Sequence, residues 1–96
     1  MTSKQRAYLR SLANSLQPIF QIGKGGISET LMKQLDDALE ARELIKVNVL
    51  ETAPEDIKVL GEQIAKQTNC VFVQAMGNKL TFYRARKKDP KIVLPK

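Results

Sequence analysis

Residues 19–28 have the sequence IFQIGKGGIS, in which a short apolar run meets a glycine-rich turn and the start of a helix. The apolar run at 19–22 predicts a buried strand that the glycines end. Ser28 is a typical helix N-cap, because its hydroxyl can accept a hydrogen bond from a free amide of the first turn, and Glu29 complements the helix dipole. The segment therefore predicts a strand, a tight turn and a helix, which is the basic step of an α/β fold.

The glycine-rich turn is also the best candidate for a binding site. Its glycines let the backbone approach a ligand closely, and the free amides of the following helix favour an anion. Nucleotide-binding motifs of the Walker and dinucleotide types need other glycine spacings. A short Gly-x-x-Gly loop instead clamps the backbone of nucleic acid in KH domains. We therefore predict that RNA contacts the four loop residues Gly23, Lys24, Gly25 and Gly26.

Apolar periodicity divides the rest of the chain into further elements. Three helices are predicted, at residues 3–16, from Ser28 onward and at about 53–67. Three more strands are predicted, at residues 44–50, 70–76 and 80–86. The third helix is expected to open with a capping box at residues 52–55, and Gly77-Asn78 is suited to a tight hairpin between the last two strands.

This element order, α-β-α-β-α-β-β, defines the expected fold class. Helices between the first three strands imply crossover connections and some parallel pairing, whereas a hairpin must be antiparallel. We expect an α/β sandwich of two or more layers with a mixed four-stranded sheet, in a single domain spanning residues 1–96. The strand order stays open, and the tail at residues 87–96 is expected to be semi-ordered.

The net charge of +6 is distributed unevenly along the chain. Residues 1–24 carry a net +4, residues 25–78 a net −4 and residues 79–96 a net +6. If the fold brings the two basic ends together, they form one electropositive face suited to a phosphate backbone; otherwise they are two unrelated solvated runs. On charge alone, the additional candidates for RNA contact are Lys4, Arg6 and Arg10 in the first helix and Arg84 and Arg86 in the last strand.

Several function classes are disfavoured by composition. The chain has no histidine, the commonest metal ligand and neutral-pH acid–base group, and its single cysteine, Cys70, fits a small core residue. The acidic residues Asp36, Asp37, Glu40 and Glu43 are interpreted as a solvated helix face. We expect no catalytic residues, no metal and no cofactor. We also expect no signal peptide and no membrane-spanning segment, and hence a cytoplasmic protein.

The opening SKQRAYLRSLANSLQPIFQIGKGGIS and the tail motif DPKIVLP together resemble the YhbY-like, or CRM (chloroplast RNA splicing and ribosome maturation), family in its bacterial stand-alone form. The resemblance implies a fold similar to the C-terminal domain of translation initiation factor three. It further implies RNA binding through Gly23, Lys24, Gly25 and Gly26, and association with ribosomal RNA of large-subunit precursors. The other basic candidates rest on charge, not on the motif.

We therefore expect a monomeric, non-enzymatic RNA-binding protein that assists assembly of the large ribosomal subunit. A second possibility remains open from the sequence. In this alternative the protein is an interaction adaptor among ribosome assembly factors, with the acidic middle or the IVLP tail as its contact.

Overall fold

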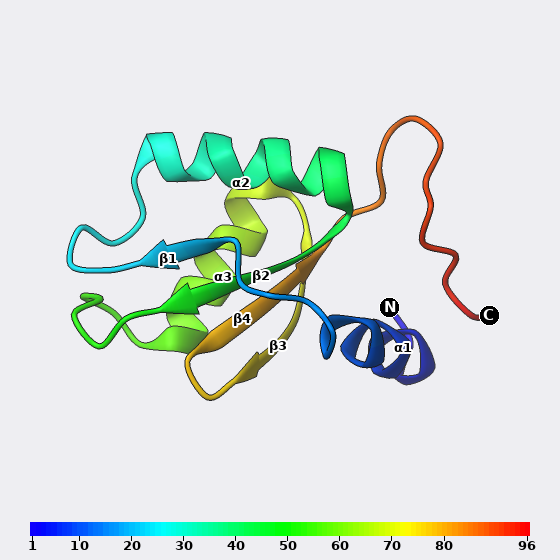
Figure 1. Cartoon of the computed structure of the whole chain (residues 1–96), viewed down its shortest axis with the longest axis horizontal. Coiled ribbons are helices and arrows are strands. Elements are labelled where there is room, and N and C mark those ends of the chain that lie inside the picture. Colours follow the sequence, from blue (N-terminus) through cyan, green and yellow to red (C-terminus); the bar gives the residue numbers. More distant parts are fainter.

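Three helices and four strands follow one another along the chain, which the computed structural model describes over residues 1–96 (Figure 1). The elements in order are α1 (Ser3–Ala13), β1 (Phe20–Ile22), α2 (Glu29–Arg42), β2 (Leu44–Val49), α3 (Ile57–Thr68), β3 (Val71–Met76) and β4 (Lys79–Tyr83). This order confirms the one predicted from the sequence. Helix α1 ends three residues earlier than expected, and Leu16 follows it in the connection to β1.

The four strands form one mixed sheet in the order β1-β2-β4-β3. Strand β1 runs parallel to β2, with Phe20 opposite Val47 and Ile22 opposite Val49. Strand β4 pairs antiparallel with both β2 and β3. The parallel pair is possible because α2 carries the chain back across the sheet before β2 begins.

The last strand is shorter than predicted, because it ends at Tyr83 and not at residue 86. Tyr83 lies opposite Leu44 and Val71, the first residues of the two neighbouring strands, so no partner extends further. The amide of Arg84 donates instead to the carbonyl of Glu43 at 2.9 Å, at the end of α2. Arg84 and Arg86 therefore follow the sheet, and their predicted place in the last strand is wrong.

Helix α3 also begins later than predicted. Its first residue is Ile57 and its N-cap is Asp56, which makes no side-chain capping bond, so the capping box at residues 52–55 does not form. Residues 50–53 turn instead against the end of β1, where the amide of Leu50 donates to the carbonyl of Ile22 at 2.8 Å. The cap predicted for α2 is confirmed, because Ser28 accepts from the amide of Leu31 at 3.1 Å.

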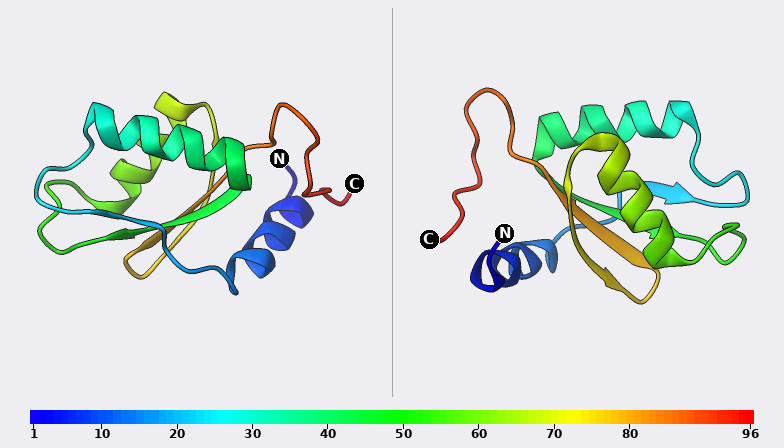
Figure 2. Two further views of the ribbon diagram at one scale, coloured as in Figure 1. Left: turned by 45° about the horizontal axis from the view of Figure 1, so that its top comes forward. Right: turned by 180° about the vertical axis from the view of Figure 1, so that it is seen from behind.

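The main core lies between the sheet and helices α2 and α3, which cover the same face (Figure 2). Its fully buried residues come from both helices and three of the strands: Ile22, Leu35, Leu39, Ile45, Val47, Val49, Leu60, Ile64, Leu80 and Phe82. In β2 the inward residues alternate with Lys46 and Asn48, as expected for a strand with one face on this core. This packing fixes the relation between the start of α2 and the side of α3.

A second, smaller core lies on the opposite face of the sheet. Leu9 and Ala13 of α1 pack there with Leu44, Val73 and Tyr83, and the tail residues Ile92 and Leu94 add to this cluster. The helices and sheet thus form three layers, within the two or more that the sequence predicted. The tail has no helix or strand of its own, but it packs beside α1 and its end lies near the N-terminus (Figure 1).

Candidate functional site

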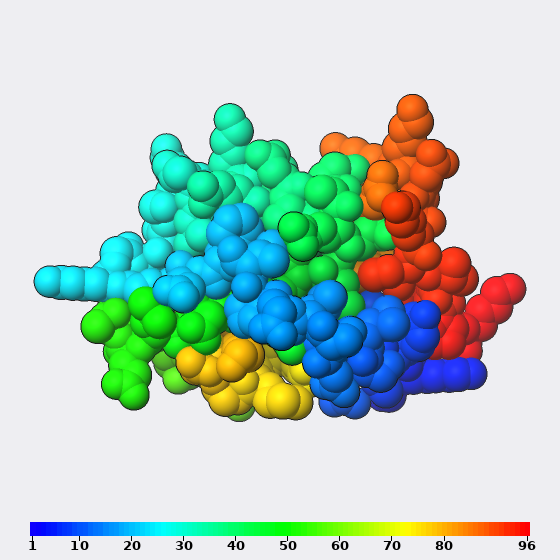
Figure 3. Space-filling model, in the orientation of Figure 1, coloured from blue at the N-terminus to red at the C-terminus, as the bar shows by residue number.

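The loop Gly23–Gly26 joins β1 to α2 and projects at one end of the molecule (Figure 3). A hydrogen bond from the amide of Gly26 to the carbonyl of Gly23, at 2.9 Å, closes the turn. Lys24 and Gly25 form the exposed tip, and the first turn of α2 follows directly after Ser28. The Lys24 ammonium and the amide of Gly25, which has no hydrogen-bond partner in the protein, together favour an anion at the tip.

The loop glycines differ in what the fold requires of them. Gly26 has a φ of +64°, and a Cβ there would lie 3.0 Å from Cγ of Pro54, so a side chain would meet both backbone strain and a steric clash. Gly25 is different, because a Cβ built on it would have no atom within 4 Å and its φ is not in the left-handed region. Nothing in the protein therefore explains the absence of a side chain at position 25.

The two basic ends of the chain lie side by side, which is the first of the two arrangements that the sequence left open. The side-chain amide of Gln5 donates to the carbonyl of Pro95 at 3.0 Å, and Ile92 and Leu94 pack on the cluster that contains Leu9. We call the exposed side of α1 and residues 85–96 the terminal surface. It does not include the glycine loop, because the two lie toward opposite ends of the longest dimension, which is 39 Å (Figures 1 and 3).

Two of the predicted RNA-binding arginines have partners inside the protein. Arg6 donates from Nη1 to the carbonyls of Phe72 and Val73, both at 2.8 Å, at the bulge in β3. Arg84 forms ion pairs with Asp36 and Glu40 and donates to the carbonyl of Thr68 at 2.8 Å, and its side chain is only 19% exposed. These guanidinium groups tie α1 to β3 and the tail to α2 and α3.

The remaining basic candidates differ in exposure. Lys4, Arg10 and Lys24 are exposed and form no ion pair, because the only two in the structure belong to Arg84. Arg86 is half-buried, and its charge acts on Glu43. Of the predicted residues, the structure thus brings the four loop residues together at one end and leaves Lys4 and Arg10 on the terminal surface.

Glu43 is not part of a solvated face, as the sequence suggested, but is 1% exposed. Its carboxylate accepts from the backbone amides of Lys91 at 2.7 Å, Ile92 at 3.1 Å and Arg86 at 3.2 Å. Burial alone would raise the pKa of Glu43, but these three amides and the charge of Arg86 outweigh it and hold the pKa below its usual value. Glu43 therefore anchors the basic tail to the end of α2.

Two further titratable side chains lie within the protein, Cys70 half-buried and Tyr83 buried. Burial raises the pKa of the Cys70 thiol, which is 3.1 Å from the hydroxyl of Thr68, so this thiol stays protonated as expected for a packing residue. Burial also raises the pKa of Tyr83, which is 6% exposed and belongs to the smaller core. Neither group forms part of the exposed loop.

No cluster of three or more potential metal-ligating side chains occurs in the structure. None of the three helices has the length and apolar character that a membrane crossing requires.

The order of elements, the glycine loop and the basic ends define a domain of the CRM class. Residues 1–84 match the model of the CRS1/YhbY (CRM) domain, and the chain belongs to this family, which is not a family of enzymes.

Similar proteins match the chain over nearly its full length. The chain is 45% identical to "Probable RNA-binding protein YqeI" of Bacillus subtilis over 95 residues, which cover 99% of both chains. It is 32% identical to a Haemophilus influenzae protein described as "RNA-binding protein", over 100% of this chain and 96% of that one. The solution structure of Staphylococcus aureus SAV1595 matches with a TM-score of 0.83 and 50% identity over 99% of each chain. This likeness confirms the predicted fold.

Proposed function

We propose that this protein is a cytoplasmic RNA-binding protein that holds the phosphate backbone of RNA at the loop Gly23–Gly26. The names of the bacterial relatives support RNA as the partner. In the proposed complex the amide of Gly25, which bonds nothing in the protein, donates to a phosphate, and Lys24 supplies an ionic contact. No chemical step is involved, so the function is binding and positioning alone.

Gly25 is the single observation that carries this proposal. Its Cα faces open space, and neither backbone strain nor a neighbouring atom requires glycine there. A missing side chain at an exposed loop tip allows another backbone to approach the amide closely, which is what a phosphate contact needs. The adjacent Lys24, also exposed, supplies the charge that a phosphate would pair with.

The basic ends extend the proposed contact with RNA, but only some of their predicted residues are free to take part. Lys4 and Arg10 are free to meet a second stretch of RNA on the terminal surface. Arg6, Arg84 and Arg86 remain candidates from their charge, but Arg6 and Arg84 already bind protein acceptors. We expect these two guanidinium groups to attract RNA through their long-range field more than through direct contact.

Charge reversal at the loop tests the proposal. Lys24→Glu should weaken binding of a single-stranded RNA oligonucleotide and reduce the slope of log affinity against log salt by about one, because one phosphate contact is lost. Fluorescence anisotropy at several salt concentrations measures both quantities. Lys33→Glu, on the exposed side of α2, makes the same change in net charge away from the loop.

The result is decided by comparing these two variants. Both should melt at nearly the wild-type temperature, because both side chains are exposed. Equal RNA affinity for the two variants would contradict a phosphate contact at the loop.

We further propose that the RNA is ribosomal RNA of large-subunit precursors and that the protein acts there as a monomer during assembly. Co-sedimentation of the protein with these precursors should be lost in Lys24→Glu. The competing function, an adaptor that contacts other assembly factors through its tail, is tested with Val93→Glu, because Val93 is 78% exposed and its replacement leaves the tail packing intact. Loss of co-sedimentation in Val93→Glu alone would favour the adaptor.

A further inference from the structure

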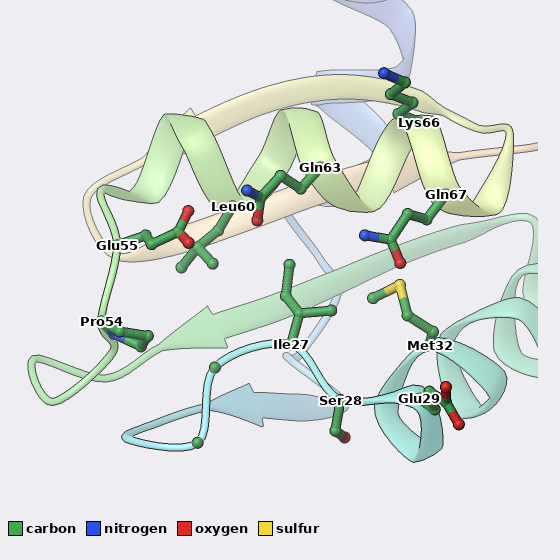
Figure 4. A pocket seen from close by; sticks show the side chains of 12 residues that line it. Ile27, Ser28, Glu29, Met32, Pro54, Glu55, Leu60, Gln63, Lys66 and Gln67 are labelled. Atoms are coloured by element: carbon green, nitrogen blue, oxygen red, sulfur yellow. The ribbon is translucent and has the colours of Figure 1, made fainter.

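A cleft of about 1000 Å³ opens between the glycine loop and helix α3 (Figure 4). Gly25 and Gly26 are among its lining residues, and Pro54 and Glu55 lie just before the start of α3 (Figure 4). Ile27 and Met32 point into the cleft from the side of α2, and Leu60 points into it from α3. Ile27 and Met32 therefore give the cleft an apolar patch beside the glycine loop, whereas Leu60, 1% exposed, belongs to the core beneath it.

Two amide side chains of α3 lie above this patch. Gln63 and Gln67 are one helical turn apart; the amide group of Gln67 points toward Met32, and that of Gln63 lies between Leu60 and Ile27 (Figure 4). Gln63 is half-buried and Gln67 is exposed, so their amide groups, which form no hydrogen bond within the protein and can both donate and accept, are open to a ligand. The cleft thus combines an apolar patch with accessible hydrogen-bonding groups, as binding sites for small ligands do.

The charges around the cleft indicate which part of an RNA strand enters it. Lys66 points away from the interior, and the carboxylate of Glu55 stands at the end beside the loop (Figure 4). A negative carboxylate repels phosphate, whereas Lys24 and the loop amides attract it on the outer side of the loop. A strand that crosses the loop would therefore keep its phosphates outside and turn its uncharged bases inward.

We propose that this cleft binds an unpaired RNA base. The base packs against Ile27 and Met32, and the amides of Gln63 and Gln67 bond to its edge. This inference rests on the proposed phosphate contact, and it adds that the protein prefers single-stranded RNA and distinguishes between bases. Unpaired bases can be unstacked and read on their edges, whereas bases inside an RNA duplex are inaccessible to such a site.

The test compares oligoadenylate, oligocytidylate and oligouridylate of equal length with a fully paired RNA hairpin of the same phosphate number. The wild-type protein should bind the three single strands with different affinities and the best of them more tightly than the hairpin. The double variant Gln63→Ala and Gln67→Ala should bind the preferred strand about tenfold more weakly and lose the discrimination, as expected for edge contacts. Its salt slope should equal that of the wild type, because no phosphate contact changes.

Gln34→Ala is the matched control, because Gln34 is an exposed glutamine of α2 outside the cleft. Alanine favours helix at all three positions, so the variants should fold. Side-chain amide resonances of Gln63 and Gln67 should move on addition of the preferred strand. Movement of the same resonances on dilution of the RNA-free protein would instead reveal a second copy in the cleft and overturn the proposal.

The two proposals fail in different ways. If the wild type binds the RNAs and Lys24→Glu weakens all of them, but the glutamine variant discriminates as the wild type does, the cleft proposal is wrong and the loop contact stands. If the wild type binds the hairpin and all single strands with equal affinity, the cleft proposal is likewise wrong and the loop contact stands. If the wild type binds none of the RNAs, the proposed function fails and the cleft proposal with it.

Discussion

At the scale of single residues, two neighbouring positions of the loop, 25 and 26, hold glycine for different physical reasons. Gly26 is required by the fold, because its backbone is left-handed and Pro54 occupies the space beside it. Gly25 is required by nothing within the chain. This difference separates a residue that shapes the loop from one that leaves room for a ligand.

Alanine substitutions at these two positions should therefore affect different properties, stability at Gly26 and RNA binding at Gly25. Gly26→Ala should lower the free energy of unfolding by about 1–2 kcal/mol, the cost of a left-handed L-residue, with any clash against Pro54 adding to it. Gly25→Ala should leave the stability unchanged and weaken RNA binding. Chemical denaturation and RNA titration measure the two effects. A stable Gly25→Ala variant with wild-type RNA affinity would show that the open space at position 25 is not used.

Glu43 is a non-glycine residue with a positive φ, and its hydrogen bonds explain why it stands there. It ends α2 with a φ of +67°, a conformation that glycine would adopt more easily, yet its carboxylate satisfies three tail amides. The strain is tolerated because a charged acceptor is needed at this point. Sequence alone did not reveal this role, since the amides that it binds are 43 to 49 residues further along the chain.

Replacing Glu43 should make stability less dependent on pH. The folded pKa is below the unfolded one, so ionised Glu43 stabilises the fold above the usual glutamate value of about 4.3, and this contribution is lost as the pH falls through the folded pKa. Glu43→Gln should cost about 1–3 kcal/mol at neutral pH, because a neutral amide binds the tail amides less well. Urea denaturation at pH 7 and at acidic pH should show that the gap between wild type and variant narrows in acid. A constant gap would contradict the role of the charge.

At the scale of elements, one glycine determines how closely α3 lies on the sheet. A Cβ at Gly61 would approach the ring of Phe72 to 2.5 Å, and that ring in turn stacks near Phe82 with the centroids 5.6 Å apart. The helix can reach this position only without a side chain there. The cleft beside the loop depends on the same placement, since Gln63 and Gln67 belong to α3.

Gly61→Ala tests this packing. Alanine is favoured over glycine in a helix by about 1 kcal/mol, whereas overpacking a core costs about 1–3 kcal/mol. We expect the contact with the rigid ring of Phe72 to outweigh the gain in helix propensity, so the melting temperature should fall. Calorimetry measures this, and a melting temperature above that of the wild type would show that α3 shifts at little cost.

The limits of sequence analysis are also clearest for elements. The order of helices and strands, the cap at Ser28 and the mixed sheet followed from local patterns, and the structure confirms them. The start of α3 and the end of β4 did not, because each depends on a distant partner. Residues 50–53 bond to β1 instead of capping α3, and β4 ends where β2 and β3 begin.

At the scale of the whole molecule, the basic charge forms two separate surfaces. The glycine loop is at one end, and the terminal surface is toward the other (Figure 3). The charge runs along the chain left open whether the two ends meet; the fold shows that they do, and that Lys24 lies apart from them. Likewise, the partners of Arg6 and Arg84 are backbone carbonyls and carboxylates that no sequence pattern reveals. The sequence therefore predicted the position of the glycine loop between a strand and a helix, and the structure shows that Arg6 and Arg84, away from this loop, already have partners in the protein.

The central claim is that RNA meets the protein first at the glycine loop. The most direct measurement is an NMR titration of the isotope-labelled protein with a single-stranded RNA too short to reach the terminal surface. The account predicts that the backbone amide resonances of Gly25 and Gly26 shift first and most, while those of α1 and the tail stay in place. Shifts confined to α1 and the tail, with the loop amides unchanged, would contradict it.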